Sequence, residues 1–308
     1  MNILIVDDIH EVLLQKLGRA AIAYSYQPDI SRADAEKAIV DYDGLIIRSK
    51  FQVDKEFIDL NPNLKMIGRA GAGMDNIDEA YASSKGIKLI PANEGNRDAV
   101  GEHMIGMLLS LMNNLNRGDR EVRSGEWKRE ENRGHELKGK TVALIGYGHN
   151  GQAMAKKLSG FDVKVIAYDK YKTGFSDLYA TEVSMEEVVR RADVLSFHIP
   201  LTRETRGMVD DEYLFHFRKP IFFLMGARGG IVKIPAVLKK LDEGKIIAAA
   251  FDVLPVEKFP ALAEEAWYED LIKRDNVLLS PHVAGWTFES YYKLSEVLAD
   301  KIIAYEYQ

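Results

Sequence analysis

The sequence of 308 residues contains no cysteine. This absence excludes disulfide bonds, thiolate nucleophiles, iron–sulfur clusters and cysteine-ligated zinc, and we predict no metal site. Long apolar runs are also missing, since no stretch approaches the ~20 residues that cross a bilayer. Residues 1–8 turn acidic after a short apolar stretch, which is not typical of a signal peptide. We therefore expect a cytoplasmic protein with no membrane partner.

The sequence also has no excess of positive charge. The 47 acidic residues outnumber the 41 basic residues, which gives a formal net charge of −6. This balance provides no general electrostatic footprint for nucleic acid, and we expect no nucleic-acid partner. With 46% hydrophobic and 29% charged residues, the composition is that of a globular protein with one large or two ordinary domains.

The first part of the chain alternates short apolar runs with helical or loop-like stretches, which is typical of a parallel sheet with crossovers. The strands expected here are residues 2–6, 44–48, 65–68 and 88–91. A helical period then begins at Asp98, and its apolar positions are Val100, Met104, Met107, Leu108, Leu111 and Leu115. A charged, irregular stretch at 117–140 separates this helix from a second set of strands. We predict a domain boundary near residue 95.

The second set of apolar runs predicts a doubly wound sheet of six strands. These strands are residues 141–145, 163–168, 194–197, 221–224, 246–251 and 277–279. Polar residues lie at or just past the carboxyl ends of five of them, namely Asp169, His198, Arg228, Asp252 and His282. Any one of these could cap a helix or satisfy a buried group. Their recurrence favours a binding site, because ligands bind at this edge of an open parallel sheet.

A glycine-rich turn follows the strand at 141–145. Gly146, Gly148 and Gly151 form the pattern G-x-G-x-x-G, and a helix-compatible segment comes next. The first glycine permits a tight turn, the second lets a pyrophosphate approach the backbone, and the third lets helix and strand pack closely. The amino terminus of the helix attracts the anion. This order of elements predicts a dinucleotide-binding turn.

Asp169 supports the same prediction. It comes 18 residues after Gly151, close to the ~20 expected for the carboxylate that binds the adenosine ribose. A carboxylate at this place repels the 2′-phosphate of NADP, so NAD is favoured. Lys170 and Lys172 leave the strictness of that preference open, and Asn150 is a polar residue where an aliphatic side chain would pack better under the turn.

Three residues suit acid–base chemistry on an anionic substrate. His282 closes the last expected strand, and the ordinary histidine pKa of ~6.5 suits proton transfer at neutral pH. Glu257 follows a turn at Pro255, so its carboxylate can orient the histidine ring and raise the ring pKa. Arg228 lies among small residues, where a guanidinium can bind a carboxylate and polarise a carbonyl. The alternative for Arg228 is a surface turn with a salt bridge.

A second glycine-rich turn lies in the first domain, at residues 69–73. Its backbone N–H groups could bind the anionic substrate next to the nicotinamide. The alternative is an ordinary tight turn.

Over essentially the whole chain these residues resemble the D-isomer-specific 2-hydroxyacid dehydrogenases. The family's segments occur here in the same order, at 146–151, 227–230, 252–257 and 280–282. The resemblance implies an α/β protein with two Rossmann-like or flavodoxin-like domains, each with a parallel sheet, and an active site in the cleft between them. Residues 1–95, completed by 287–308, would bind the substrate, and residues 96–286 would form the NAD-binding Rossmann domain.

The family pattern also implies roles for individual residues. Arg228 would bind the substrate carboxylate and carbonyl, His282 would be the acid and base, and Glu257 its partner. The positions assigned to the cofactor are Gly146, Tyr147, Gly148, His149, Asn150, Gly151, Asp169, His198, Ile199, Pro200, Gly226, Ala227, Asp252, Ala284 and Gly285. The positions assigned to the substrate are Arg48, Ser49, Arg69, Ala72, Gly73 and Arg129.

Within the family, residues 47–49 and 68–77 look like the substrate segments of members that act on 3-phosphoglycerate in serine biosynthesis. Residues 125–129 look like a loop that supplies a basic group to the partner subunit of a homodimer. The length implies a short form without regulatory domains. The alternatives are a glyoxylate, hydroxypyruvate or D-lactate type reductase and, from another class, an NAD-sensing protein similar to a corepressor.

Four positions depart from the family pattern: Asn150, Met225, Lys233 and Lys258. None of them removes a group expected to be catalytic. Altered kinetics or cofactor affinity is compatible with these departures.

Overall fold

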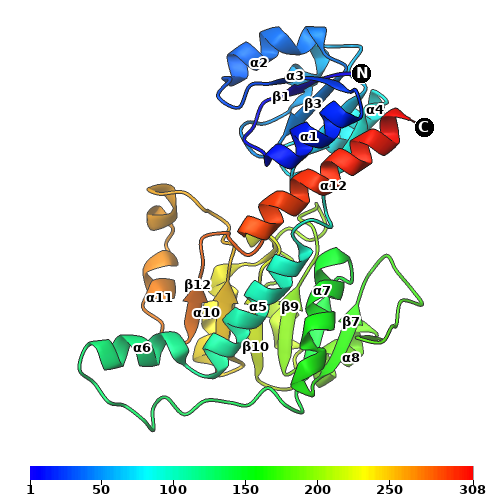
Figure 1. Cartoon of the computed structure of the whole chain (residues 1–308). Helices are drawn as coiled ribbons and strands as arrows, with labels where there is room; N and C mark the ends of the chain where they lie inside the picture. The colour runs from blue at the N-terminus through cyan, green and yellow to red at the C-terminus, as the bar shows by residue number, and fades with distance from the viewer. Residues whose placement is uncertain (308) are drawn as a thin grey trace. The chain divides into compact units, whose positions relative to one another are not determined.

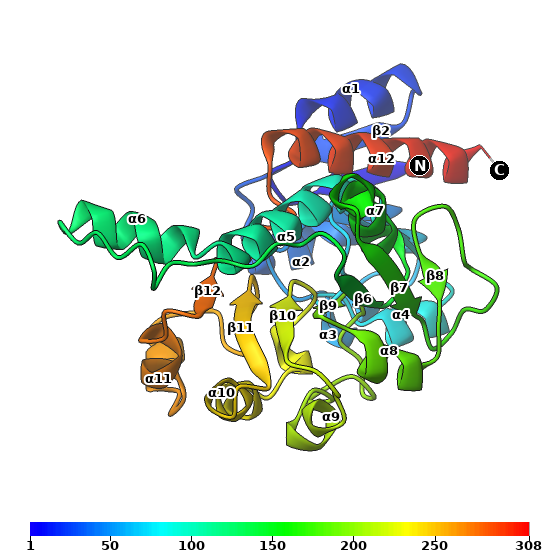
Figure 2. The same ribbon diagram turned by 90° about the horizontal axis from the view of Figure 1, so that it is seen from below.

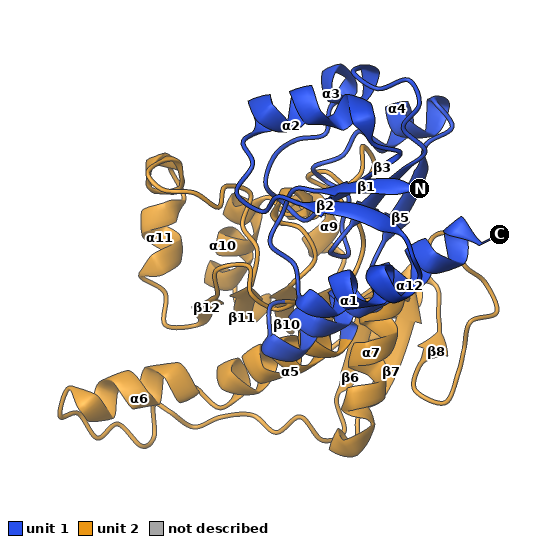
Figure 3. Cartoon of the chain, turned by 45° about the horizontal axis from the view of Figure 1, so that its top comes forward, with its two compact units in different colours: residues 1–97, 286–308 blue, residues 98–285 orange. Residues whose placement is uncertain are grey.

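The computed structural model describes residues 1–307, which form two compact units (Figure 3). Unit 1 comprises Met1–Arg97 and Trp286–Gln308, and unit 2 comprises Asp98–Gly285. The chain thus passes between units two residues after the predicted boundary, and it returns to unit 1 at Trp286. Each unit has its own parallel sheet with helices on both faces, as expected for a doubly wound α/β fold.

The sheet of unit 1 has five parallel strands in the order β2-β1-β3-β4-β5. Their bounds are β1 Asn2–Ile5, β2 Ala23–Tyr26, β3 Gly44–Ile47, β4 Met66–Arg69 and β5 Lys88–Pro91. The four predicted strands are present within one residue at each end. The edge strand β2 was not predicted, because none of its four residues is buried and it carries no clear apolar pattern.

Helices cover both faces of this sheet (Figure 3). One face packs against α1 (Glu11–Arg19) and α12 (Phe288–Glu306), and the other against α2 (Arg32–Ala38), α3 (Lys55–Asp59) and α4 (Glu79–Ser84). Successive side chains of a strand point to opposite faces, so Ile3 and Ile5 belong to the first core and Leu4 to the second. The carboxyl-terminal helix is therefore an integral part of unit 1.

The sheet of unit 2 has seven parallel strands in the order β12-β11-β10-β9-β6-β7-β8. Their bounds are β6 Thr141–Ile145, β7 Lys164–Tyr168, β8 Thr181–Glu182, β9 Val194–Phe197, β10 Ile221–Met225, β11 Ile246–Phe251 and β12 Val277–Leu279. All six predicted strands are present. The additional β8 has two residues, which is too short to give a periodic signal.

Figures 1 and 2 show the helices of unit 2 on the two sides of its sheet. One core lies under α5 (Arg97–Met112) and α7 (His149–Leu158), and the other under α8 (Met185–Arg191), α9 (Asp211–Phe215) and α10 (Ile234–Asp242). The short α11 (Tyr268–Ile272) precedes β12. Single 3₁₀ turns occur at Ile39–Asp41, Ser159–Phe161, Gly229–Ile231 and Ala261–Glu264. No helix in residues 1–307 combines the length and apolarity of a membrane span.

The stretch after α5 differs from the prediction. The α5 helix ends at Met112, Asn114 adopts a left-handed conformation with φ of 52°, and a separate helix α6 spans Leu115–Arg123. Leu115 was predicted on the apolar face of α5 but is 57% exposed. The helical part of the charged stretch was missed because α6 buries no residue and therefore shows no core-facing apolar stripe.

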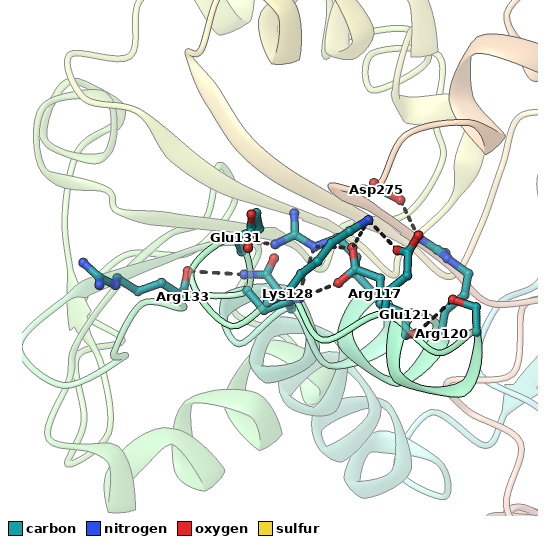
Figure 4. A network of polar contacts seen from close by, with 11 residues as sticks. Arg117, Arg120, Glu121, Lys128, Glu131, Arg133 and Asp275 are labelled. Atoms are coloured by element: carbon teal, nitrogen blue, oxygen red, sulfur yellow. Dashed lines mark hydrogen bonds and ion pairs between the residues drawn. The ribbon is translucent and has the colours of Figure 1, made fainter.

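We call residues 115–133 the arm, because they extend away from the sheet of unit 2 (Figures 2 and 3). Polar contacts hold the arm together (Figure 4). Arg117 Nε donates to Asn132 Oδ1 at 3.0 Å and Asn132 Nδ2 bonds to Glu121 Oε2, while Arg120 pairs with Asp275. The arm is thus ordered by charge pairs and hydrogen bonds rather than by a core.

Candidate functional site

The carboxyl ends of the strands of unit 2 bring the predicted polar residues to one edge of the sheet. Asp169 follows β7, His198 follows β9, and Arg228 lies three residues after β10. Asp252 directly follows β11, and His282 lies three residues after β12. Because all the strands are parallel, these ends share one edge, which is where open α/β sheets bind their ligands.

The glycine-rich turn has the geometry that an anion requires. Gly146 has a φ of +94°, and a Cβ on it would lie 2.6 Å from the carbonyl oxygen of His198. A Cβ on Gly151 would lie 2.4 Å from the carbonyl oxygen of Gly146. Gly148 is the N-cap of α7, and nothing lies within 4 Å of its missing Cβ. The turn is therefore tight on its inner side and open at the helix amino terminus, which fits a pyrophosphate.

Asp169 organises the rim of this turn. Its Oδ2 accepts a hydrogen bond from Tyr147 N at 2.9 Å, and its Oδ1 accepts one from Tyr171 N at 3.0 Å. Each carboxylate oxygen keeps a free lone pair for a ribose hydroxyl. The carboxylate thus joins the glycine-rich turn to the loop after β7 and remains able to accept a ligand hydrogen bond.

A pocket of about 420 Å³ lies beside Asp169. Of the predicted cofactor residues, Gly146, Gly148, Asp169, His198, Ile199 and Pro200 line it. The exposed His149 starts α7 beside the turn. Gly226, Ala227, Asp252, Ala284 and Gly285 do not line this pocket, and they follow strands β10, β11 and β12 further along the sheet. Burial lowers the pKa of His198 to about 4, so the ring is neutral at pH 7.

Tyr147 and Asn150, which were both predicted to bind the cofactor, have buried side-chain polar or aromatic groups. The Tyr147 side chain is fully buried; its hydroxyl donates to Asp177 at 2.9 and 3.0 Å, and its ring stacks on Phe175. Only the backbone of Tyr147 is therefore available to a cofactor. Asn150 Oδ1 is buried and has no hydrogen-bond partner among residues 1–307, and nothing in the structure explains this polar substitution.

Asp252 shapes the turn that carries His282. The Asp252 side chain is almost completely buried, and its carboxylate accepts hydrogen bonds from Ser280 Oγ at 2.6 Å, Val283 N at 2.9 Å and Ala284 N at 3.0 Å. Its backbone carbonyl accepts one from His282 N at 2.7 Å. His282 has a φ of +56°, a left-handed conformation that a non-glycine residue adopts only when its surroundings impose it.

His103 was missed by the sequence analysis. It lies on α5, and its Nε2 is 2.9 Å from Ser280 Oγ and 3.5 Å from Asp252 Oδ1. No local pattern links it to these residues, because 177 positions separate it from Ser280. The sequence offered one signal for His103, a hydrophilic residue next to the apolar face of α5. This signal does not identify Ser280 or Asp252 as its partner.

The contact expected between His282 and Glu257 is present. His282 Nδ1 lies 2.9 Å from Glu257 Oε2, and the two side chains are 49% and 40% exposed. The hydrogen bond to the Glu257 carboxylate raises the pKa of His282 above its ordinary value, against the opposite effects of burial and of the Arg228 charge. Since Nδ1 faces Glu257, Nε2 is the ring nitrogen left for a substrate.

Arg228 lies in a turn that packs against the segment leading to Glu257. A Cβ on Gly229 would come within 2.0 Å of the Leu254 backbone, so only glycine permits this approach. The Arg228 guanidinium donates from Nη1 to the Ala227 carbonyl at 2.7 Å. Its charge acts on His282, so Arg228, Glu257 and His282 form one electrostatic group.

The predicted substrate residues of unit 1 follow strands β3 and β4. The Asp7 carboxylate accepts hydrogen bonds from Arg48 N, Ser49 N and Lys50 N at 2.7–2.9 Å. Arg69 Nε donates to the Arg48 carbonyl at 3.0 Å. The partly exposed Ala72 and Gly73 come next along the chain. Arg48, Ser49 and Arg69 are thus gathered at one sheet edge.

Arg48 has an aromatic neighbour that was not predicted. Its guanidinium carbon lies 4.5 Å from the ring centroid of Trp286, a cation–π distance. Arg48 Nη1 is buried and has no hydrogen-bond partner in the described chain. Arg129, the remaining predicted substrate residue, belongs to unit 2, where it lies on the arm. Its side chain is 86% exposed beside Glu130.

Removing the Glu257 charge will change the titration of His282. In Glu257→Gln we expect the pKa of His282 to fall, because the Glu257 contact is the largest cause that raises it, and burial and Arg228, which favour the neutral ring, are then opposed by the Asp252 charge alone. Histidine ring resonances followed by NMR against pH, assigned with His282→Gln, measure the change. Glu264→Gln removes an exposed charge seven residues further on and serves as the control. An unchanged midpoint in Glu257→Gln would show that the pair does not persist in solution.

Comparisons with known proteins agree with this geometry. Residues 105–284 match the model of the NAD binding domain of D-isomer specific 2-hydroxyacid dehydrogenases. The chain is 32% identical to the D-3-phosphoglycerate dehydrogenase of Archaeoglobus fulgidus over 98% of its own length, and it spans 57% of that relative. It is 35% identical to the glyoxylate reductase of Thermofilum pendens, over 89% of this chain and 81% of that relative.

The solved structures include a further neighbour. The NAD-dependent formate dehydrogenase from Staphylococcus aureus in complex with NAD has a TM-score of 0.78 at 26% identity, over 99% of this chain and 96% of that chain. The segment that the family model matches makes up more than half of the sequence and contains the glycine-rich turn, Asp169, Arg228 and His282. The protein belongs to the D-isomer specific 2-hydroxyacid dehydrogenase family, and residues 105–284 are its NAD-binding domain.

Proposed function

We propose that the protein is an NAD-dependent dehydrogenase that interconverts a D-2-hydroxy acid and the corresponding 2-keto acid. The observation that carries this proposal is the contact between His282 and Glu257, next to Arg228, at the sheet edge of the NAD-binding domain. A histidine with a raised pKa exchanges a proton near neutral pH. A neighbouring guanidinium supplies the charge that a carboxylate substrate needs.

The residues divide the chemistry between them. Arg228 binds the substrate carboxylate and polarises the oxygen on C2. His282 takes the hydroxyl proton on Nε2 during oxidation and returns it to the carbonyl oxygen during reduction, while Glu257 stabilises the charged ring through Nδ1. NAD, when bound, supplies the hydride acceptor and donor. The Asp252 hydrogen bonds hold the His282 turn in position for this transfer.

For the substrate we propose 3-phosphoglycerate and 3-phosphohydroxypyruvate, the pair that resembling enzymes use on the route to serine. Arg48 and Arg69 support this choice, since they lie together at one sheet edge and Arg48 Nη1 is left without a partner in residues 1–307. The second candidate is a glyoxylate or hydroxypyruvate reductase. It is favoured by the Thermofilum relative, which this chain covers over 81% of its length.

Absorbance of NADH at ~340 nm, the band of the reduced nicotinamide, tests the proposal. The substrates are 3-phosphoglycerate, phosphohydroxypyruvate, hydroxypyruvate, glyoxylate and pyruvate, each with NAD or NADH as the direction requires. We expect turnover that falls roughly 10²–10⁴-fold in His282→Gln, because proton transfer by a positioned side chain contributes about that factor. Near-normal turnover in this variant would contradict the role of His282. Tight NADH binding without any turnover would instead support an NAD-sensing protein.

Neutralising the two arginines of unit 1 separates the substrate candidates. In Arg48→Gln and Arg69→Gln we expect a KM for phosphohydroxypyruvate raised by roughly tenfold or more per variant, since each loses a charge-assisted contact to phosphate. The KM for glyoxylate, which has no phosphate, should remain within about twofold. Equal losses on both substrates would contradict the phosphate role and favour the reductase.

We also propose that a second copy of the chain covers the arm, as expected for a homodimer. Leu115, Val122 and Trp127 are 57%, 54% and 83% exposed on it, and large apolar groups left exposed on one segment are typical of a contact surface. Arg129, two residues after Trp127, would then reach the partner's substrate.

Charges placed on the arm test this arrangement. We expect the wild type to be a dimer by light scattering and Leu115→Glu/Val122→Glu to be a monomer, because a buried unpaired carboxylate is strongly unfavourable. Leu178→Glu, at a residue that is 88% exposed outside the arm, is the control and should stay dimeric. A monomeric wild type at micromolar concentration would contradict the proposal.

A further inference from the structure

The rim of the Asp169 pocket carries two lysines whose role the sequence left open. Lys170, Tyr171 and Lys172 follow β7, and Glu204 lies in the loop after β9. All four line the same pocket as Asp169. A 2′-phosphate on the adenosine ribose would be placed beside Asp169, so the charges on this rim decide whether it is attracted or repelled.

Glu204 joins the two loops across the rim. Its Oε2 forms a salt bridge with Lys170 Nζ and accepts a hydrogen bond from the Tyr171 hydroxyl at 2.9 Å. The loop that carries Glu204 is itself ordered. Thr202 Oγ1 accepts a hydrogen bond from Glu204 N at 3.2 Å, and Thr205 Oγ1 donates to the Pro200 carbonyl at 2.7 Å. The carboxylate is therefore held in position from its own side of the pocket.

The second lysine is also engaged. Lys172 Nζ donates to the Tyr147 carbonyl of the glycine-rich turn at 2.9 Å. Among the described residues that line the pocket, Lys170 and Lys172 are the two lysines, and there is no arginine. Both lysines have protein partners. The salt bridge lowers the pKa of Glu204 and raises that of Lys170, so both groups are ionised at neutral pH.

We propose that Glu204 is a cofactor-specificity residue that discriminates against NADP by sequestering Lys170. With Lys170 paired, the rim presents two carboxylates, Asp169 and Glu204, to a ribose 2′-phosphate and leaves neither lysine to neutralise it. A ribose hydroxyl carries no charge and is accepted by Asp169 as before. The proposal rests on the NAD-binding domain and on the adenosine half of the cofactor lying in this pocket, and it does not depend on the identity of the hydroxy acid.

The pair can be removed without disturbing the fold. Lys170 and Glu204 are each 57% exposed, and exposed ion pairs contribute little to stability. Asp169, the glycine-rich turn and the acid–base pair remain intact in Glu204→Gln. A change in cofactor preference in this variant therefore reports the charges at the rim rather than a change in folding.

The test compares NADH with NADPH, which differ in the 2′-phosphate alone. Dissociation constants are measured by fluorescence titration of the wild type, Glu204→Gln, Glu204→Gln/Lys170→Gln and the control Glu269→Gln. The control breaks an exposed pair with Lys273 elsewhere on unit 2. We expect the ratio of the NADPH to the NADH dissociation constant to fall about tenfold in Glu204→Gln, the effect of one favourable charge interaction. It should return toward the wild-type value in the double variant and stay unchanged in the control.

An unchanged ratio in Glu204→Gln would overturn the proposal. A fall that persists in the double variant would overturn the sequestration of Lys170, since the effect would then not pass through the lysine. Wild type that binds neither nucleotide would overturn the proposal together with the assignment of the adenosine pocket. Inactivity of the wild type on every hydroxy acid would contradict the proposed function but leave the binding ratios, and this proposal, standing.

Discussion

The parallel arrangement of the strands is the constraint on which both units depend. A chain that runs every strand of a sheet in one direction has to return along a helix or loop on one of its faces after each strand, so all the carboxyl ends within a unit meet at one edge. In unit 2 this edge collects residues that are 23 to 136 positions apart, from Gly146 to His282. The direction of the backbone therefore brings the residues of the candidate site to one edge, independently of the contacts that their side chains make.

Hydrogen bonds to buried carboxylates then determine how individual turns leave that edge. Asp252 is almost fully buried, and hydrogen bonds from Ser280, Val283 and Ala284 compensate for the loss of water around it. These bonds bend the chain so that His282 takes its left-handed conformation with Nδ1 toward Glu257. Asp7 acts in the same way in unit 1, where three successive N–H groups after β3 converge on its carboxylate.

The cofactor pocket and the arm show two different uses of exposed charge. At the Asp169 pocket, the Lys170–Glu204 pair is exposed and contributes little to stability, and we propose that it sets the charges that a ribose phosphate would meet. On the arm, charge pairs and hydrogen bonds keep a segment ordered that has no core of its own and that exposes Leu115, Val122 and Trp127. The same kind of interaction thus lines a pocket in one place and maintains local order in the other.

Much of this architecture is predictable from local pattern. Ten of the twelve strands, the glycine-rich turn and its acidic partner were predicted because apolar runs, glycines and turn residues act over a few positions. The edge strands β2 and β8 and the helix α6 were not, since each buries too few residues to leave a periodic signal. Of the departures from the family pattern, Met225 ends the buried strand β10 and Lys233 forms a salt bridge with Asp210, whereas nothing in the structure explains Lys258.

By itself, the sequence determined the parallel α/β fold, the positions of ten strands along the chain and the residues that stand at the carboxyl ends of five of them. The contact of His282 with Glu257 was predicted, but the tertiary structure alone revealed three other pairs: His103 with Ser280, Arg48 with Trp286, and Glu204 with Lys170. The physical reason is the distance along the chain over which each kind of interaction acts. Backbone conformation is set by neighbours a few residues away, whereas a hydrogen bond, a cation–π contact or a salt bridge requires two distant segments to meet, and only packing of the helices and sheets brings them together.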